Sequence, residues 1–139
     1  MKIRTDFVTN SSSSCYIVAF KGLPAISEAT IKRYPFLEQY QKLVESVVFN
    51  TNAYYPAVVV DNIIDLRDYF LSCKSIDVDT FDELIKNDEF VEKWYKECLN
   101  YINKGYSILF KKVDYYESEN DLIKSMESKD FHILYRYGV

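Results

Sequence analysis

Few side chains in the sequence are of the kinds that carry out chemistry. The chain has one histidine, His132, and three widely separated cysteines without a Cys-x-x-Cys spacing, Cys15, Cys73 and Cys98. Nucleophilic catalysis needs a base beside its nucleophile, and a structural zinc site needs several ligands together. The three glycines are too few and too scattered for a phosphate-binding loop. We therefore expect a binding protein rather than an enzyme, with no catalytic residue, no metal site and no cofactor, although the sequence leaves an enzyme open.

A run of short polar side chains near the start is a candidate ligand site. It consists of Asn10, Ser11, Ser12, Ser13 and Ser14. Their amide and hydroxyl groups can hydrogen-bond the backbone, a phosphate or another ligand at little steric cost. The run is typical of a tight connection between two strands, and the alternative is a loop that binds a nucleotide or another small molecule. The nearest following lysine is Lys21, across the next predicted strand, which weakens the phosphate alternative.

The acidic residues are concentrated in one segment. The 139-residue chain carries 17 Lys and Arg against 21 Asp and Glu, a net charge of −4. Residues 61–92 hold ten acidic and three basic residues, a charge of −7, whereas the parts before and after carry +2 and +1. Carboxylates three and four residues apart share a helix face, where they repel each other and attract basic partners. In the alternative interpretation, Asp61, Asp79 and Asp88 serve as helix caps and first-turn acids.

Paired tyrosines in predicted loops are the second candidate contact surface. Tyrosine is enriched at protein interfaces because its ring buries area while its hydroxyl finds a partner. Together with the acids, the pairs form the predicted partner-binding set: Asp65, Asp68, Asp82, Glu83, Glu89, Tyr54, Tyr55, Tyr115 and Tyr116. The net negative charge and the lack of a large basic cluster argue against direct binding of nucleic acid or of a membrane surface.

The strands that must position these residues are predicted from runs of β-branched and aromatic residues. The sequence predicts strands near 15–21, 106–113 and 130–137, with a further candidate at 3–8. Residues 58–60 fit either a short strand or the lead-in to the next helix. In the last strand, the period of two places Phe131, Ile133, Tyr135 and Tyr137 on one face.

Helices account for most of the remaining chain. Apolar residues recur at helical spacing near 36–48, 63–73, 81–85, 90–102 and 122–126. The aromatic residues on these stripes are predicted to be core residues: Phe36, Phe70, Phe81, Phe90 and Trp94. The predicted fold class is α+β, a small and mostly antiparallel sheet packed against about four to six helices on one side. With 48% hydrophobic residues and no linker-like stretch, residues 1–139 are expected to form a single globular domain.

Targeting signals are not evident in the sequence. The start lacks the apolar stretch of a signal peptide, and no apolar run approaches the roughly 20 residues that span a bilayer. An odd number of scattered cysteines is typical of reduced thiols buried as small hydrophobic residues in a cytosolic protein. We therefore expect a cytoplasmic location.

The first 20 residues carry a recognisable signature. Residues 2–14 read KIRTDFVTNSSSS, and an apolar strand beginning with Cys15 and Tyr16 follows. This start resembles that of many small uncharacterised proteins from Gram-positive bacteria, their phages and prophages, in which an aromatic residue follows the serines directly. The resemblance implies an origin in a mobile element and a bacterial host cell, and it implies no activity.

These observations favour a non-enzymatic, protein-binding inhibitor from a phage or prophage. Its acidic, tyrosine-bearing surface would block a bacterial host or defence protein that has a basic surface, in one version by mimicking nucleic acid. A toxin-immunity protein is an alternative that uses the same surface. A small-molecule or nucleotide binder, or an enzyme, that uses the loop from Asn10 to Ser14 is the alternative of a different class. The sequence leaves homo-oligomerisation open.

Overall fold

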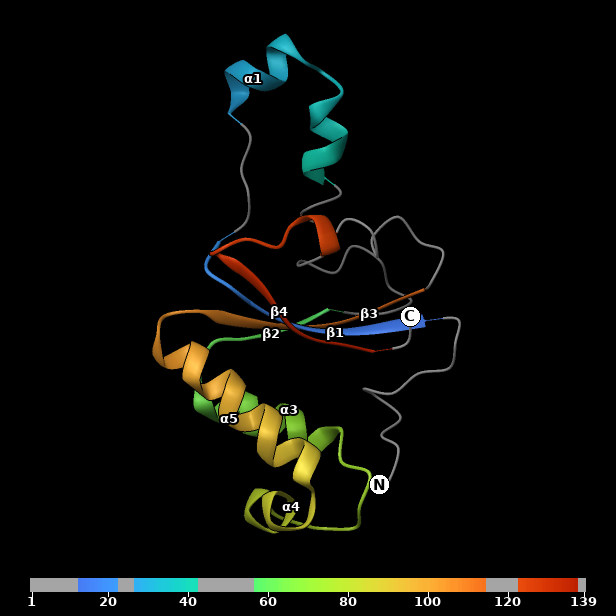
Figure 1. Cartoon of the computed structure of the whole chain (residues 1–139), viewed down its shortest axis with the longest axis vertical. Helices are drawn as coiled ribbons and strands as arrows, with labels where there is room; N and C mark the ends of the chain where they lie inside the picture. Colours follow the sequence, from blue (N-terminus) through green and yellow to red (C-terminus); the bar gives the residue numbers. More distant parts are fainter. Residues whose placement is uncertain (1–12, 23–26, 43–56, 115–122, 138–139) are drawn as a thin grey trace.

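The protein is an α+β fold built around a four-stranded antiparallel sheet (Figure 1). The computed structural model describes residues 13–22, 27–42, 57–114 and 123–137. The strand order is β2-β3-β1-β4. The strands are β1 (Ser13–Phe20), β2 (Val58–Val60), β3 (Ser107–Asp114) and β4 (Phe131–Tyr137). The three predicted strands are confirmed, residues 58–60 form a strand, and the candidate strand at 3–8 lies outside the described residues.

Strand β1 is an interior strand of the sheet and is buried on both faces because a core packs against each of them. It pairs with β3 on one side and with β4 on the other. Its residues 15–20 form an unbroken apolar run in which every side chain is buried. Alternate residues contribute to two separate cores, with Ile17 and Ala19 in one and Tyr16 and Val18 in the other. A continuous apolar run is the pattern expected of a strand covered on both faces.

Three helices cover one face of the sheet (Figure 1). They are α3 (Ile63–Ser72), α4 (Phe81–Asn87) and α5 (Glu89–Asn103). Each helix follows an N-cap residue whose side chain accepts a hydrogen bond from a backbone N–H group in the first turn. The N-cap residues are Asn62, Thr80 and Asp88 respectively. The prediction that Asp61 caps the first of these helices is wrong, because the Asn62 side chain accepts from the backbone N–H of Asp65 at 2.9 Å.

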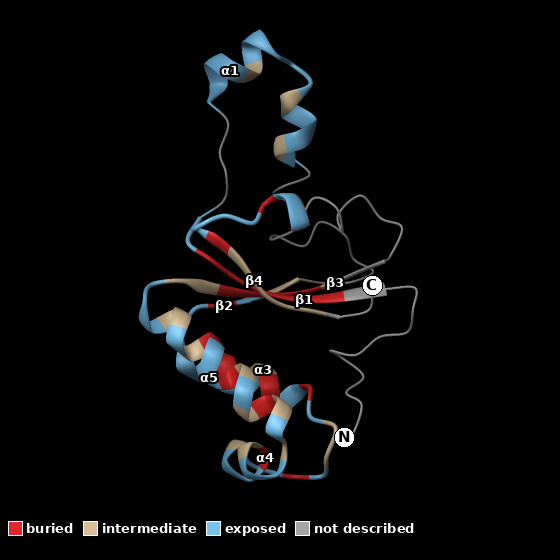
Figure 2. Cartoon of the chain, viewed as in Figure 1, coloured by how far each residue is buried: buried red, intermediate tan, exposed pale blue. Residues whose placement is uncertain are grey.

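A second, smaller core lies on the opposite face of the sheet, and the helix predicted near 122–126 belongs to this face. A helical turn at 123–125 covers part of this face, and Ile123 and Met126 pack against β1, β3 and β4. Figure 2 shows buried residues both beneath this segment and along α3 and α5. The expectation of helices on one side therefore describes only the α3–α5 layer.

A β-bulge in β4 changes the predicted faces of that strand. Val18 pairs with Ile133 and Ile17 pairs with Tyr135, so Leu134 is an extra residue. For the residues that follow, the insertion reverses the alternation of side chains between the two faces of the sheet. Ile133 packs in the core beneath the 123–126 segment, whereas Tyr135 packs against the α3–α5 core. The prediction that Phe131, Ile133, Tyr135 and Tyr137 share one face is therefore wrong for Tyr135.

Residues 27–42 form an arm that extends away from the sheet (Figure 1). The arm contains α1 (Glu28–Arg33), which has no buried residue, and a further helical segment at 37–42. Phe36 is 70% exposed, so its predicted place in the core is wrong. By contrast, Phe70 is fully buried, and Phe81, Phe90 and Trp94 pack against the α3–α5 core as predicted.

Candidate functional site

The structure separates the predicted acidic surface into two groups. Asp65 and Asp68 share a face of α3 with Tyr69 and Ser72, because these residues lie three and four positions apart. All four line a hollow beside the sheet. The remaining acids of the predicted set lie on α4 and the first turn of α5, at Asp82, Glu83 and Glu89.

Arg67 lies on a different side of α3 and joins it to the other two helices. Its Nε atom donates a hydrogen bond to the Tyr95 hydroxyl on α5 at 3.0 Å. Its guanidinium lies 5.6 Å from the centre of the Phe81 ring on α4. The hydrogen bond and the charge interaction with Tyr95 raise the pKa of Arg67, and Asp82 adds a smaller effect in the same direction. Asp82 is therefore the member of the acidic set that has a basic neighbour on another helix.

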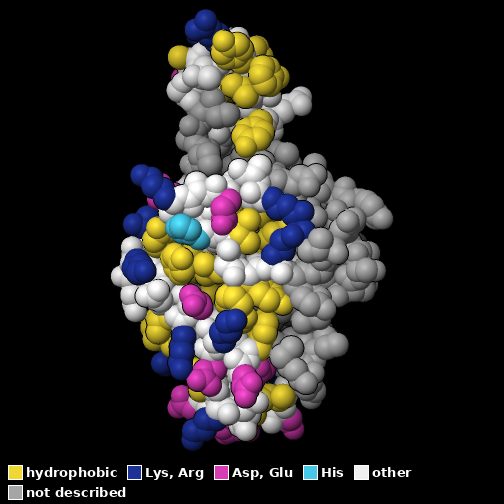
Figure 3. All heavy atoms as spheres, in the orientation of Figure 1, with side chains coloured by type: hydrophobic (Ala, Val, Ile, Leu, Met, Phe, Trp, Pro, Cys, Tyr) yellow, Lys and Arg dark blue, Asp and Glu magenta, His cyan; other side chains and the backbone are white. Residues whose placement is uncertain are grey.

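Residues 77–92 form an acidic end of the molecule, made by α4 and the start of α5. The segment holds seven acidic residues and one basic residue, Lys86. Asp82, Glu83 and Glu89 are all exposed. Figure 3 shows Asp and Glu side chains gathered over this end of the molecule. We refer to residues 77–92 as the acidic end.

Local structural roles explain part of this charge. The Asp88 carboxylate accepts from the backbone N–H groups of Phe90 and Val91 at 3.0 and 3.2 Å, as an N-cap does. Glu92 forms an ion pair with Lys96 at 2.9 Å. The cap interpretation thus holds for Asp88, and it does not hold for Asp61 or Asp79, since Asn62 and Thr80 occupy the corresponding cap positions.

Several predicted site residues fall outside the described part of the chain. They are Asn10, Ser11, Ser12, Tyr54, Tyr55, Tyr115 and Tyr116. Ser13 and Ser14 begin β1 and pair with Asp114 and Val113 of β3. The predicted ligand loop therefore leads directly into the central part of the sheet.

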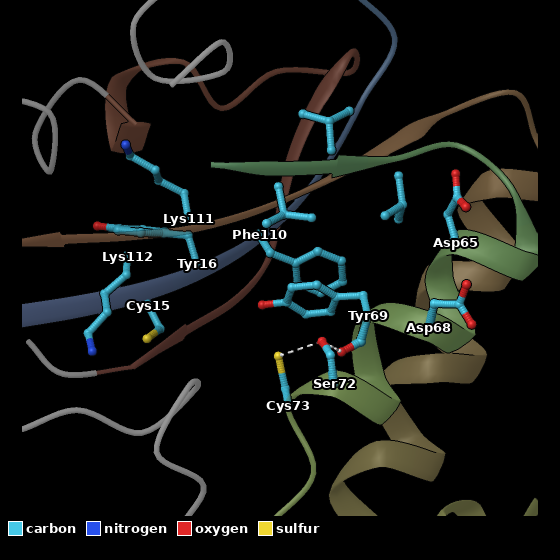
Figure 4. Close-up of a pocket in the computed structure, with 13 residues that line it drawn as sticks. Cys15, Tyr16, Asp65, Asp68, Tyr69, Ser72, Cys73, Phe110, Lys111 and Lys112 are labelled. Atoms are coloured by element: carbon cyan, nitrogen blue, oxygen red, sulfur yellow. Dashed lines mark hydrogen bonds between the residues drawn. The ribbon is translucent and has the colours of Figure 1, made fainter. Parts of the chain in front are cut away.

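The hollow has a volume of about 830 Å³ and lies between α3 and the sheet (Figure 4). Figure 4 shows Lys111 and Lys112 at one end, Asp65 and Asp68 at the other, and aromatic rings between them. The complete lining is Cys15, Tyr16, Val58, Val59, Val60, Asp65, Asp68, Tyr69, Ser72, Cys73, Phe110, Lys111 and Lys112. Ligand pockets in proteins commonly have this size and combine apolar walls with a few polar groups.

The three cysteines are buried thiols, as predicted, and none forms a disulfide. Cys15 and Cys73 line the hollow, and the Cys73 sulfur lies 3.7 Å from the Ser72 hydroxyl oxygen. Cys98 lies in the core on α5, where desolvation and, to a lesser extent, the charge of Glu97 raise its pKa to about 12. A thiol in that environment is protonated at neutral pH and is a poor nucleophile.

His132 and the acidic residues give no metal site in the described part of the chain. The His132 ring lies 5.5 Å from that of Tyr101 and 5.7 Å from that of Tyr106, on the edge strand β4. Among the residues described, no three His, Cys, Asp or Glu side chains come together in an arrangement that could hold a metal ion.

Comparison with protein families, with curated proteins and with solved structures finds no match to this chain. The geometry of the described residues is therefore the basis for inferring a function. In the described segments, no helix has the length and apolar character needed to cross a membrane.

The sheet side of the hollow was not evident from the sequence. Lys111, Tyr16 and Phe110 belong to strands that read as ordinary core strands, and Tyr69 and Ser72 were not singled out on α3. One available signal was the pair Lys111-Lys112 within an otherwise apolar strand, since charged residues are rarely placed in interior strands without a partner.

Proposed function

We propose that this protein is a non-enzymatic binding protein that inhibits a bacterial protein by covering a basic surface of it. The observation that carries the proposal is the acidic end, where the exposed carboxylates of Asp82, Glu83 and Glu89 lie on two consecutive helices. Seven acidic residues against one basic residue leave a net charge of −6 on this segment.

Charge of one sign that is concentrated on one part of a surface mainly affects how the protein associates with other proteins. Like charges placed together repel, and the repulsion weakens when a positively charged surface covers them. Complementary charge also speeds the encounter of two proteins and selects between partners. A nuclease or another protein with a basic surface would meet carboxylates here where it otherwise meets phosphates.

The biological setting is part of the same proposal. The N-terminal resemblance supports a phage or prophage origin, and with it a bacterial cytoplasm as the place of action. A toxin-immunity protein would use the acidic end in the same way, since it also neutralises a partner by covering its surface. The separation of Asp65 and Asp68 from the acidic end removes these two residues from the proposed contact surface.

The test is a binding experiment with a charge-reversed acidic end. The variant carries Asp82→Lys, Glu83→Lys and Glu89→Lys, and both it and the wild-type chain are immobilised and exposed to a bacterial lysate. A protein captured by the wild type is purified and its affinity is measured at two salt concentrations, about 50 mM and about 500 mM, because salt screens exposed charges. We expect the affinity to fall steeply with salt and to be lost in the variant.

The matched control carries the same change of charge elsewhere: Glu28→Lys, Glu38→Lys and Asp130→Lys. These residues are exposed and lie on the arm and in the turn before β4. We expect the control to retain most of the affinity. Binding that is insensitive to salt, or an equal loss in both variants, would contradict the proposal. Inhibition is then tested on the activity of the purified partner.

A further inference from the structure

Strand β2 has one open edge. It is the first strand in the order β2-β3-β1-β4, so it pairs with β3 on one side, and no strand of the described residues lies on its other side. An edge strand presents unpaired backbone N–H and C=O groups, which can pair with another chain. The sheet could therefore be extended by a further strand beside β2.

The opposite edge of the sheet is obstructed. Strand β4 carries the β-bulge at Leu134, and the Glu127 carboxylate accepts a hydrogen bond from the backbone N–H of Ile133 at 2.7 Å. Bulges and charged side chains are common means by which proteins keep an edge strand from pairing. Strand β2 has neither, since its three residues are all valine.

The pairing pattern shows which backbone groups of β2 are directed outward. The backbone N–H of Lys21, just after β1, donates to the carbonyl of Asp130, just before β4, so Lys21 directs its backbone groups toward β4. In antiparallel strands this direction alternates from one residue to the next. Val18 therefore faces β3, its partner Leu109 faces β1, and Val59, opposite Leu109, directs its N–H and C=O away from β3.

The open edge borders the hollow. All three residues of β2 line the hollow, and α3 lines it with Asp65, Asp68, Tyr69 and Ser72. Figure 4 shows β2 above and α3 below, both in green, with Asp65 and Asp68 at one end. Because α3 covers one face of the sheet, a strand added beside β2 would turn alternate side chains toward α3.

Exposed apolar side chains gather at the same place. Among the described residues, the large apolar side chains that are exposed lie on the arm or here, at Val59, Ile63 and Ile64. Val59 is 43% exposed and Ile64 is 68% exposed. Ile64 lies one helical turn before Asp68 on α3. A segment that covers this edge would therefore remove apolar surface from water, which favours binding.

The charge on the α3 side of the hollow is negative. Asp65 accepts a hydrogen bond from the neutral side chain of Asn62 at 2.8 Å, and Asp68 forms no hydrogen bond or ion pair with the residues described. Both carboxylates are exposed. Lys111 and Lys112 lie at the other end of the hollow. Basic side chains would thus be favoured where an added segment faces Asp65 and Asp68.

We propose that β2 binds an extended, basic segment of a partner protein by antiparallel strand addition. One residue of the segment exchanges both backbone hydrogen bonds with Val59 and projects to the same face as Val59. The residues before and after it project to the other face, toward Asp65 and Asp68. The segment therefore alternates, with an apolar residue opposite Val59 and a lysine or arginine on either side.

Synthetic peptides with blocked ends test the strand addition. The probe Lys-Val-Lys-Val-Lys is titrated into the full chain by calorimetry, and we expect a Kd below about 1 mM. Glu-Val-Glu-Val-Glu, which reverses the charge, should bind at least about tenfold more weakly. The probe with both valines N-methylated lacks the N–H that pairs with Val59, and it should lose at least about as much affinity. In a proton–nitrogen correlation spectrum, the backbone signal of Val59 should shift with the probe.

Variants then locate the peptide on the chain. Val59→Pro removes the outward N–H and no hydrogen bond to β3, so it should weaken binding at least about tenfold. Val59→Thr keeps the N–H and should change the Kd less than about threefold. Asp68→Lys should weaken binding at least about fivefold. Its matched control is Glu97→Lys, at an exposed residue of α5 outside the hollow, which should change the Kd less than about twofold.

Three results would overturn the proposal. The first is the absence of probe binding at concentrations up to about 10 mM. The second is equal affinity of the N-methylated probe, which would mean that side chains alone hold the peptide. The third is an equal loss of affinity in the Asp68 and Glu97 variants, which would remove the role of the charge on α3. Melting curves identify a variant that fails to fold, in which case the N-methylated probe and the Val59 signal decide. This surface is separate from the acidic end, so its failure would leave the proposed inhibitor function unaffected.

Discussion

The ring of Tyr69 on α3 stacks on the ring of Phe110 on β3, with the ring centres 3.9 Å apart and the planes at 17°. Phe110 also meets Phe70 edge to face, with the centres 5.7 Å apart. Tyr69 and Phe70, which are consecutive residues of α3, thus contact the Phe110 ring from two directions. The contact fixes the helix against the sheet between the two ends of the hollow.

Replacing Phe110 should therefore destabilise the whole domain. Phe110 is 3% exposed, and a Phe→Ala change in a core costs about 3–5 kcal/mol. We expect Phe110→Ala to lower the urea midpoint strongly, and Tyr69→Ala, at the half-buried partner, to lower it less. Equal effects of the two substitutions would show that the stack, and not the burial of Phe110, dominates.

Removal of the N-cap of α5 should destabilise the protein less than the replacement of Phe110. Asp88→Ala removes the acceptor of two backbone N–H groups and should cost about 1 kcal/mol in the free energy of unfolding. Asp79→Ala serves as the control, because Thr80 caps α4, and it should change stability by less than about 0.5 kcal/mol. Urea denaturation of both variants measures the difference, and an equal loss would contradict the assigned cap.

Deletion of Leu134 tests the bulge. Without the extra residue, Ile133 and Tyr135 become neighbours and regular alternation resumes, so Tyr135 should stay opposite Ile17 on the α3–α5 face, where its ring lies 5.0 Å from Trp94 and 5.5 Å from Phe90. Trp94 is the only tryptophan, so its fluorescence emission should stay close to that of the wild type. Leu134→Ala keeps the bulge and serves as the control. A shift of the emission to longer wavelength after the deletion alone would mean that Tyr135 needs the bulge to keep its face.

Burial of Cys98 should make stability fall in alkaline solution. Its pKa rises from 9.0 to about 12 on folding, mainly through desolvation. Above pH 9 the unfolded chain loses this proton before the folded chain does, so the contribution is complete below pH 9 and declines as the pH rises towards 12. The expected slope is about 1.4 kcal/mol per pH unit in that window.

The Cys98→Ala variant isolates this slope from the other groups that titrate there. We expect the free energy of unfolding to decline less steeply above pH 9 in the variant than in the wild type. The same burial predicts that Cys98 in the folded protein reacts with a thiol reagent more slowly than an unfolded control does. Parallel pH profiles of the variant and the wild type would contradict the raised pKa.

Local sequence patterns were sufficient to predict most of the helices and strands. The run from Cys15 to Phe20 predicted β1, and the helical spacing around Leu66 and Phe70 predicted α3, because burial on one or two faces leaves a direct periodic signal. The α+β class followed from the order of these elements. Phe36 had the same helical spacing, but periodicity does not say whether a stripe is covered, and the arm leaves this ring exposed.

The candidate sites depended on long-range information that spacing does not contain. Asp65 and Asp82 belong to one acidic segment, yet Asp65 lines the hollow beside the sheet whereas Asp82 acts on Arg67, which lies on a different side of α3. The contact between Arg136 and Tyr16 joins residues 120 positions apart, and simple alternation counted from Phe131 without the bulge would assign Arg136 to the other face. A shift of one residue moves every following side chain to the other face, so register has to be known before such a site can be recognised.

The pairing of β1 also sets the order in which the chain can fold. Both neighbours of this strand, β3 and β4, come late in the sequence. During synthesis, the apolar segment from Cys15 to Phe20 therefore leaves the ribosome long before either partner exists. Non-local pairings of this kind slow folding and prolong the exposure of strand edges. A chain truncated before β4 should accordingly aggregate more readily than the full chain.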